Sequence, residues 1–165
     1  MSYLVRKVKA HDEEVLAYIQ TESWKVAFKN ILSAEMLRKY TDINRAKEIY
    51  KELLNKNIGH GYILEVNNKP HCIAYWDKTR EDDMLGYAEL INIHSLQDNW
   101  AKGYGTKMME RVIKDIKEAG YKKVMLWVFE ENYRARKFYE ARGFCFNGKN
   151  KESFGAKEVC YEKSL

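Results

Sequence analysis

The chain has 165 residues, of which 45% are hydrophobic and 13% aromatic, so it can build one ordinary core and is too short for two domains to be expected. No apolar run is as long as a membrane span, and the first ten residues are unlike a signal peptide, so we expect a cytoplasmic protein that binds no membrane. The formal net charge of +5 comes from 29 basic and 24 acidic residues that are interleaved, which gives little support to nucleic-acid binding but would help to attract an anionic cofactor.

The three cysteines, Cys72, Cys145 and Cys160, are odd in number, widely spaced and without a C-x-x-C pair. This pattern indicates neither a disulfide framework nor a zinc site. We expect reduced thiols and no metal.

The first third of the chain predicts one strand followed by three helices. Residues 3–8 alternate like a short strand, and Asp12 is expected to cap a helix that ends within residues 24–30. Ser33 marks the start of a second helix, and a third covers residues 44–57. The aromatic residues of this region can be core or line a pocket, and the sequence leaves both readings open.

From residue 61 the pattern changes to strands. Residues 62–66 and 71–76 predict a hairpin whose turn covers residues 67–70 and includes the single proline, Pro70. A further strand over residues 86–95 is followed by an amphipathic helix, 105–119, that carries apolar residues at i, i+3 and i+4. A continuous apolar run, 124–129, predicts a central strand. The remaining elements are a helix and two strands, expected over residues 132–142, near Phe144 and over residues 157–163.

The stretch W-A-K-G-Y-G-T, residues 100–106, predicts an anion-binding turn at the start of the amphipathic helix. Gly103 and Gly105 allow positive φ angles and close approach of the backbone to a ligand. The unpaired N–H groups of the helix start favour a phosphate, and Lys102 adds a full charge. The spacing matches neither a Walker loop, which needs G-x-x-x-x-G-K-[ST], nor the dinucleotide fingerprint G-x-G-x-x-G.

Taken together, these pieces resemble the GNAT acyltransferase superfamily, which transfers an acyl group from acyl-CoA to an amine. The resemblance spans nearly the whole chain and rests on A-E-L-I-N-I-H-S, the turn, V-M-L-W-V-F and the block N-Y-R-A-R-K-F-Y-E-A-R-G-F. Trp100 stands where the family has Gln or Arg. The early stretch 23–33 resembles a bacterial subgroup whose members differ in acceptor.

The resemblance implies an α+β fold with a mixed, mainly antiparallel central sheet of six to seven strands flanked by about four helices. In this family the fourth and fifth strands splay apart to admit the pantetheine arm, and here those strands would be residues 86–95 and 124–129. The chain would form a single N-acetyltransferase domain. Whether it forms a homodimer is left open.

The resemblance also implies acetyl-CoA as co-substrate and a small-molecule or peptide amine as acceptor. The cofactor pyrophosphate would bind the N–H groups of the turn, and the pantetheine arm would pair with the backbone of the splayed strand and contact the helix start. The implied cofactor-binding residues are Ile93, Ser95, Lys102, Gly103, Tyr104, Gly105, Thr106, Asn132 and Tyr139.

Two side chains are candidates for catalysis. Tyr139 matches the family tyrosine that lies near the cofactor sulfur, and its phenol could protonate the departing thiolate. Glu89 lies in an apolar strand, where an unpaired carboxylate is costly, and it matches a glutamate that serves as base in several members. His94 is an alternative base, but strict alternation would point it away from Glu89. A non-catalytic acyl-CoA sensor is the competing interpretation.

Overall fold

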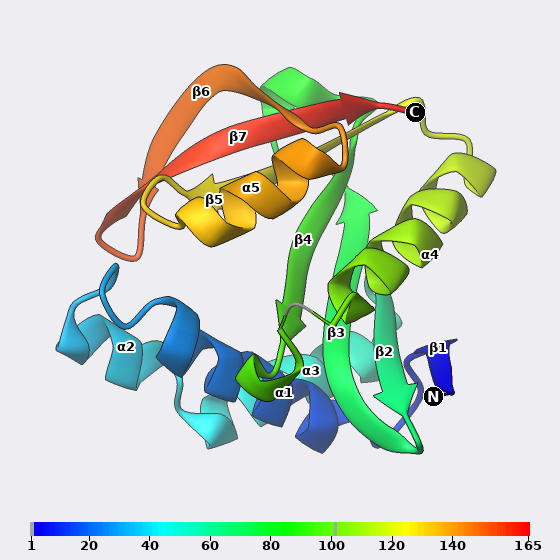
Figure 1. The fold of residues 1–165 in the computed structure, drawn as a ribbon, viewed down its shortest axis with the longest axis vertical. Helices are drawn as coiled ribbons and strands as arrows, with labels where there is room; N and C mark the ends of the chain where they lie inside the picture. Colours follow the sequence, from blue (N-terminus) through cyan, green and yellow to red (C-terminus); the bar gives the residue numbers. More distant parts are fainter. Residues whose placement is uncertain (1, 101) are drawn as a thin grey trace.

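A seven-stranded sheet with strand order β1-β2-β3-β4-β5-β7-β6 forms the centre of the computed structural model, which describes residues 2–100 and 102–165 (Figure 1). All neighbouring strands are antiparallel except β4 and β5, which are parallel. The predicted mixed, mainly antiparallel sheet is therefore confirmed. The strands are β1 (Tyr3–Lys7), β2 (His60–Val66), β3 (Lys69–Lys78), β4 (Ala88–Ser95), β5 (Lys123–Phe129), β6 (Cys145–Ser153) and β7 (Ala156–Ser164).

The described residues form five α-helices, close to the four expected. They are α1 (Glu13–Ala27), α2 (Ala34–Tyr40), α3 (Ile43–Asn55), α4 (Tyr104–Glu118) and α5 (Tyr133–Ala141). Two short 3-10 helices, η1 (Asp82–Met84) and η2 (Gln97–Asn99), flank β4. None of the helices in the described part of the chain is both long enough and apolar enough to cross a membrane.

The helices cover both faces of the sheet. On one face, α1 and α3 pack against alternate residues of the central strands, such as Ile63, Ile73 and Tyr75. On the other face, α4 and α5 pack against the residues in between, such as Leu64 and Ala74. Each central strand is therefore buried on both sides, which explains the continuous apolar runs in the sequence.

Local sequence signals place most helix starts. The Ser33 hydroxyl accepts a hydrogen bond from the N–H of Met36, as an N-cap does. Asp12 lies at the N-cap position of α1, but its side chain does not cap the helix. Its carboxylate instead accepts bonds of 2.8 and 3.0 Å from the Arg6 guanidinium and one of 2.8 Å from the N–H of Lys9. The predicted boundary was right, and the predicted role of the Asp12 side chain was wrong because the charged bonds are stronger.

The β2–β3 hairpin turns on two residues instead of four. Asn67 and Asn68 have φ angles of +52° and +67°, the left-handed values that a tight two-residue turn requires. Pro70, which the sequence placed in the turn, belongs to β3 and pairs with Glu65 beside a register shift. A proline is tolerated there because the bulge interrupts the hydrogen-bond ladder.

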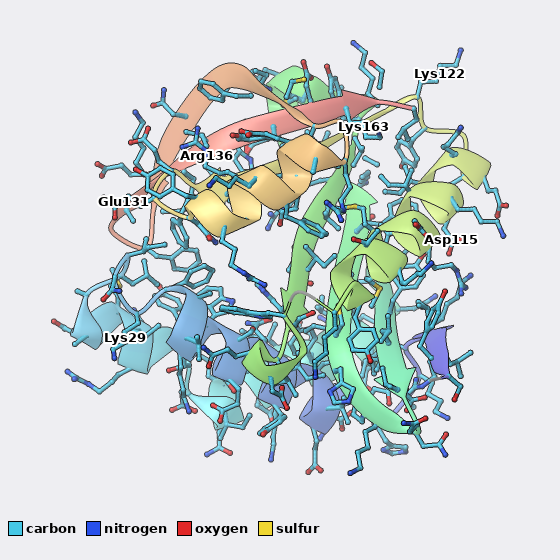
Figure 2. All side chains as sticks on the ribbon, in the orientation of Figure 1. Lys29, Asp115, Lys122, Glu131, Arg136 and Lys163 are labelled. Atoms are coloured by element: carbon cyan, nitrogen blue, oxygen red, sulfur yellow. The ribbon has the colours of Figure 1, made fainter. Side chains whose placement is uncertain are left out.

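Charged side chains of both signs surround the molecule, as the labelled residues Lys29, Glu131, Lys122 and Lys163 show (Figure 2). The basic and acidic residues that are interleaved along the sequence are therefore interleaved on the surface as well.

Candidate active site

Strands β4 and β5 separate soon after they begin, and a cavity passes between them. They pair only at Ala88 with Val124 and at Glu89 with Met125. Beyond this point a cavity of about 900 Å³ opens, lined by residues of both sheet faces. Ile91 and Trp127 line it on the α1–α3 face, while Leu90 and Tyr139 line it on the α4–α5 face. The expected splay of these two strands therefore gives one passage through the sheet.

A bulge at Ile91 decides which side chains of β4 face the α1–α3 side. The register shifts so that Trp76 pairs with Leu90 whereas Tyr75 pairs with Asn92. This extra residue breaks strict alternation. Glu89 therefore lies on the same face as His94, which pairs with Ile73. The expectation that His94 points away from Glu89 was wrong, and both side chains line the cavity.

Beyond Glu89, no strand of the described residues pairs with the edge of β4 that faces the passage. The N–H of Leu96 donates to the carbonyl of His71 on the β3 side. Since successive residues of a strand point these groups to opposite edges, Ile93 and Ser95 direct theirs toward the gap. The carbonyl of Ser95 accepts a bond of 3.0 Å from the indole N–H of Trp100. The edge that remains is suited to pairing with an extended amide-containing chain.

The predicted anion-binding turn lies at the start of α4, and of its residues Trp100 lines the cavity. Gly103 caps the helix with a φ angle of +83°, and no atom lies within 4 Å of the position that a Cβ would take. Lys102 is exposed, Tyr104 stacks on His71, and Thr106 is hydrogen-bonded to Arg142. Of the predicted motif, Ala101 lies outside the described residues.

Gly105 packs against α5, and a Cβ there would meet the Phe138 ring at 3.3 Å. It is therefore a packing glycine, whereas Gly103 leaves open space above a helix start. Open space and left-handed backbone at a helix start together suit a phosphate group.

Trp100 and Arg134 connect the turn to α5. The Arg134 guanidinium lies 3.5 Å from the centroid of the Trp100 ring, and burial lowers the pKa of Arg134. Both residues line the cavity. Sequence analysis assigned no role to Arg134 because the stack joins residues from two separate elements.

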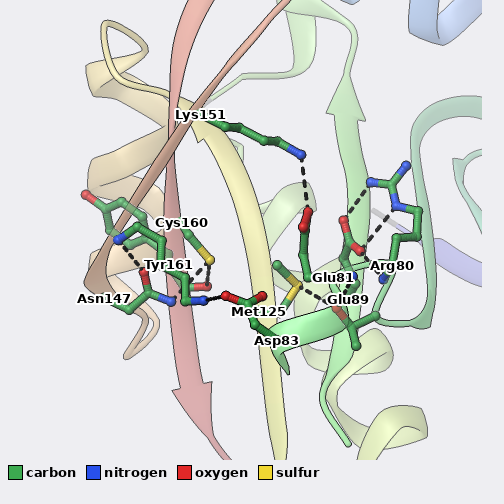
Figure 3. A network of polar contacts seen from close by, with 11 residues as sticks. Arg80, Glu81, Asp83, Glu89, Met125, Asn147, Lys151, Cys160 and Tyr161 are labelled. Atoms are coloured by element: carbon green, nitrogen blue, oxygen red, sulfur yellow. Dashed lines mark hydrogen bonds and ion pairs between the residues drawn. The ribbon is translucent and has the colours of Figure 1, made fainter. Parts of the chain in front are cut away.

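Glu89 is 1% exposed and is held in place by Arg80. The Arg80 guanidinium donates bonds of 2.6 and 3.2 Å to the two carboxylate oxygens, and the Arg80 backbone N–H donates a third of 3.0 Å (Figure 3). These contacts satisfy the buried charge, and the partner lies nine residues earlier in the chain. Its side chain lines the cavity.

Tyr139 lies on α5 and is 8% exposed. The edge of its ring contacts two other rings, with centroid distances of 5.6 Å to Phe138 and 5.9 Å to Phe144. Burial raises the pKa of Tyr139, so the phenol keeps its proton throughout the neutral range. Asn132 caps α5 by accepting a bond of 3.3 Å from the N–H of Ala135. Both residues line the cavity on its α4–α5 side.

His94 is a neutral hydrogen-bond acceptor in this site. Its Nε2 accepts a bond of 3.1 Å from the indole N–H of Trp24, and burial lowers the pKa of His94 to about 4. A histidine with this pKa carries no charge at neutral pH and is a weak base there.

We expect His94 to make folding less favourable in acid. Between pH 6.5 and about 4, the unfolded chain binds a proton at His94 that the folded chain does not. The free energy of unfolding therefore falls as pH falls through this window, and above pH 6.5 His94 causes no change in it. The loss is at most about 3 kcal/mol, because His94 keeps some exposure toward the cavity. Urea unfolding at pH 7 and pH 4.5 should show a smaller difference for His94→Gln than for the unmodified protein. Equal differences would contradict the assignment.

Two further cavity residues were missed from the sequence. Glu158, on β7, is a buried carboxylate, and burial raises its pKa. Asn92, on β4, has a buried side-chain oxygen to which no described residue donates. Their roles depend on pairing between distant strands, which single-sequence patterns do not reveal. The described residues contain no group of His, Cys, Asp and Glu side chains that could hold a metal ion, and their cysteines are free thiols.

Comparison with known proteins identifies the family. The model of the acetyltransferase (GNAT) family matches residues 25–144. An uncharacterised N-acetyltransferase of Archaeoglobus fulgidus is 28% identical over 107 residues, which are 62% of this chain and 71% of that protein. Another from Mycobacterium tuberculosis is 25% identical over 145 residues, 88% of this chain and 90% of that protein.

A solved structure has the same fold. The PaiA N-acetyltransferase of Thermoplasma acidophilum, crystallised in complex with coenzyme A, aligns over 100% of both chains with a TM-score of 0.82 and 21% identity. The strand order and the parallel β4–β5 pair agree with the family that the model match over residues 25–144 identifies. This chain therefore belongs to the GNAT family and is an N-acetyltransferase.

Proposed function

We propose that the protein transfers the acetyl group of acetyl-CoA to a primary amine by direct attack in a ternary complex. The observation that carries this proposal is the passage between β4 and β5, which joins the two faces of the sheet in one cavity. A donor bound on the α4–α5 side and an acceptor bound on the α1–α3 side would meet inside it. Mixing the protein with acetyl-CoA and a panel of amines, and measuring free thiol, tests the activity directly.

The donor would be held mainly by backbone groups. The N–H groups of residues 102–106 at the start of α4 bind the pyrophosphate, with the positive end of the helix dipole behind them. The pantetheine amides pair with Ile93 and Ser95 at the free edge of β4, and Asn132 contacts the arm from α5. The N–H of Ser95 polarises the thioester oxygen.

The reaction forms one C–N bond and breaks one C–S bond. The amine nitrogen attacks the thioester carbon, and the proton that it loses passes through water to the carboxylate of Glu89, which Arg80 holds in a fixed position. The C–S bond then breaks, and the thiolate takes the phenolic proton of Tyr139. Proximity of the two reactants in the passage supplies much of the rate enhancement.

Replacing Gly103 should weaken acetyl-CoA binding. A valine side chain at Gly103 would fill the open space above the helix start, where the pyrophosphate is proposed to bind. Calorimetric titration should show the affinity of Gly103→Val for acetyl-CoA reduced by about a hundredfold, as expected when several charge-assisted hydrogen bonds are lost.

Gly120 provides a matched control for backbone strain. It lies just beyond the other end of α4, with a φ angle of +98° and no atom within 4 Å of a Cβ position. Gly120→Val should therefore lose similar stability and keep full affinity. Equal affinities in the two variants would place the phosphates elsewhere.

A further inference from the structure

Glu158 is a buried carboxylate on the cavity wall whose charge has no direct partner in the described structure. It is 9% exposed, forms none of the ion pairs among the described residues, and has the neutral Ser153 hydroxyl as its hydrogen-bond donor. Leaving a buried carboxylate uncompensated is costly. A ligand cation would remove that cost.

The neighbouring cations are already committed to other carboxylates. Lys151 lies opposite Glu158 in the β6–β7 ladder, but its ammonium reaches Glu81 at 3.4 Å and lies 4.3 Å from the Trp127 ring centroid (Figure 3). Arg80 is bonded to Glu89. Of the three carboxylates in this cluster, Glu158 is the one that neither of the two cations contacts directly.

The surroundings of Glu158 suit an alkylammonium group. Glu158 pairs across the ladder with Phe129, which belongs to an aromatic cluster with Phe28 and Phe154. Trp24 extends this cluster, and all four rings line the cavity. Aromatic faces attract cations and their edges pack against methylene groups, so this wall favours an aliphatic cation over an anion.

Glu158 is too far from the Ile93 and Ser95 edge to bind the amine that reacts there. In the strand order β4-β5-β7, two strand spacings would separate them by about 10 Å. Because β4 and β5 are splayed apart beyond Glu89, the separation is greater than this. At β4 itself, the Asn92 side chain lines the cavity, and no described residue donates a hydrogen bond to its oxygen. The cavity thus has two places for amino groups, separated by a distance that a short carbon chain spans.

We propose that Glu158 binds a second, non-reacting ammonium group of the acceptor, so that the acceptor is an aliphatic amine with two amino groups several carbons apart. This inference rests on the acetyl transfer proposed above. The reacting amino group lies beside Asn92 at the β4 edge, the carbon chain lies along Phe129 and Trp127, and the second ammonium forms an ion pair with Glu158.

Pentylamine and 1,5-diaminopentane test this, because they differ only in the second amino group. The unmodified enzyme should show a kcat/KM for the diamine about tenfold or more above that for pentylamine, well beyond the factor of two given by its two equivalent ends, as expected from one charge-assisted bond. In Glu158→Gln the advantage of the diamine should disappear, with kcat/KM for pentylamine changed by less than about twofold. Glu130→Gln is the control, since Glu130 lies just beyond β5, pairs with Lys157 and does not line the cavity.

Equal kcat/KM values for the two amines in the unmodified enzyme would overturn the inference, even if Glu158→Gln fails to fold. So would a diamine preference that survives in Glu158→Gln. Calorimetric binding of both amines separates this inference from the proposed function. If the diamine binds in a way that depends on Glu158 but is not acetylated, only the proposed function is overturned. If both amines are acetylated with equal kcat/KM, only the role of Glu158 is overturned.

Discussion

Glu89→Gln is expected to lower turnover by about a hundredfold or more, with the largest loss at low pH, if Glu89 accepts the proton of the amine. At low pH most of the amine is protonated, so removal of its proton limits the rate most strongly there. A pH–rate profile from pH 6 to 9 with a good acceptor at saturation measures the effect. A profile that matches the unmodified enzyme would reject Glu89 as the base.

Arg80→Met is the control that separates chemistry from structure. Both variants break the same ion pair, but only Glu89→Gln removes the carboxylate. If Glu89 only supports the fold, the two variants should lose activity and unfolding free energy in parallel. If it is the base, Arg80→Met should lose less turnover than Glu89→Gln for the same loss of unfolding free energy, because it keeps the carboxylate.

Tyr139→Phe should lower the chemical rate by about tenfold to a thousandfold while the affinity for acetyl-CoA stays nearly constant. The substitution keeps the ring, and therefore its packing against Phe138 and Phe144, and removes only the hydroxyl. An interaction made only in the transition state affects turnover and leaves ground-state binding unchanged. Stopped-flow measurement of thiol release in a single turnover isolates this step.

Tyr62→Phe supplies the comparison for this experiment. Tyr62 belongs to the same core cluster as Tyr139, but its hydroxyl donates a bond of 2.7 Å to Asp115, and it does not line the cavity. This variant should lose stability and keep its rate of thiol release. A Tyr139→Phe enzyme with an unchanged single-turnover rate would show that Tyr139 is a packing residue.

The sequence predicts the elements whose signals are local. The apolar spacing of α4, the Ser33 cap and the continuous apolar run of β5 each depend on residues within one or two turns of the chain, and the structure confirms all three. Gly103 has the positive φ that a glycine allows, whereas Gly105, in the same motif, does not.

The sequence fails where distant residues compete for the same group. Asp12 binds Arg6 of a preceding strand instead of capping its own helix, and Glu89 has a partner in Arg80 from the loop after β3. Glu158 has no cation in direct contact because Arg80 and Lys151 form ion pairs with other carboxylates. The sequence does not reveal these pairings. His94 was misplaced because a bulge adds a residue to β4, and bulges depend on the pairing of two strands.

Beyond the bulge at Ile91, the main chain and the side chains of β4 meet two different substrates. In the proposed complex, β4 serves the donor through the main chain of Ile93 and Ser95, and it serves the acceptor through the side chains of Asn92 and His94. Main-chain contacts do not depend on which side chain is present. Substitutions at Asn92 and His94 can therefore alter acceptor preference during evolution while the main-chain contacts to the donor are kept.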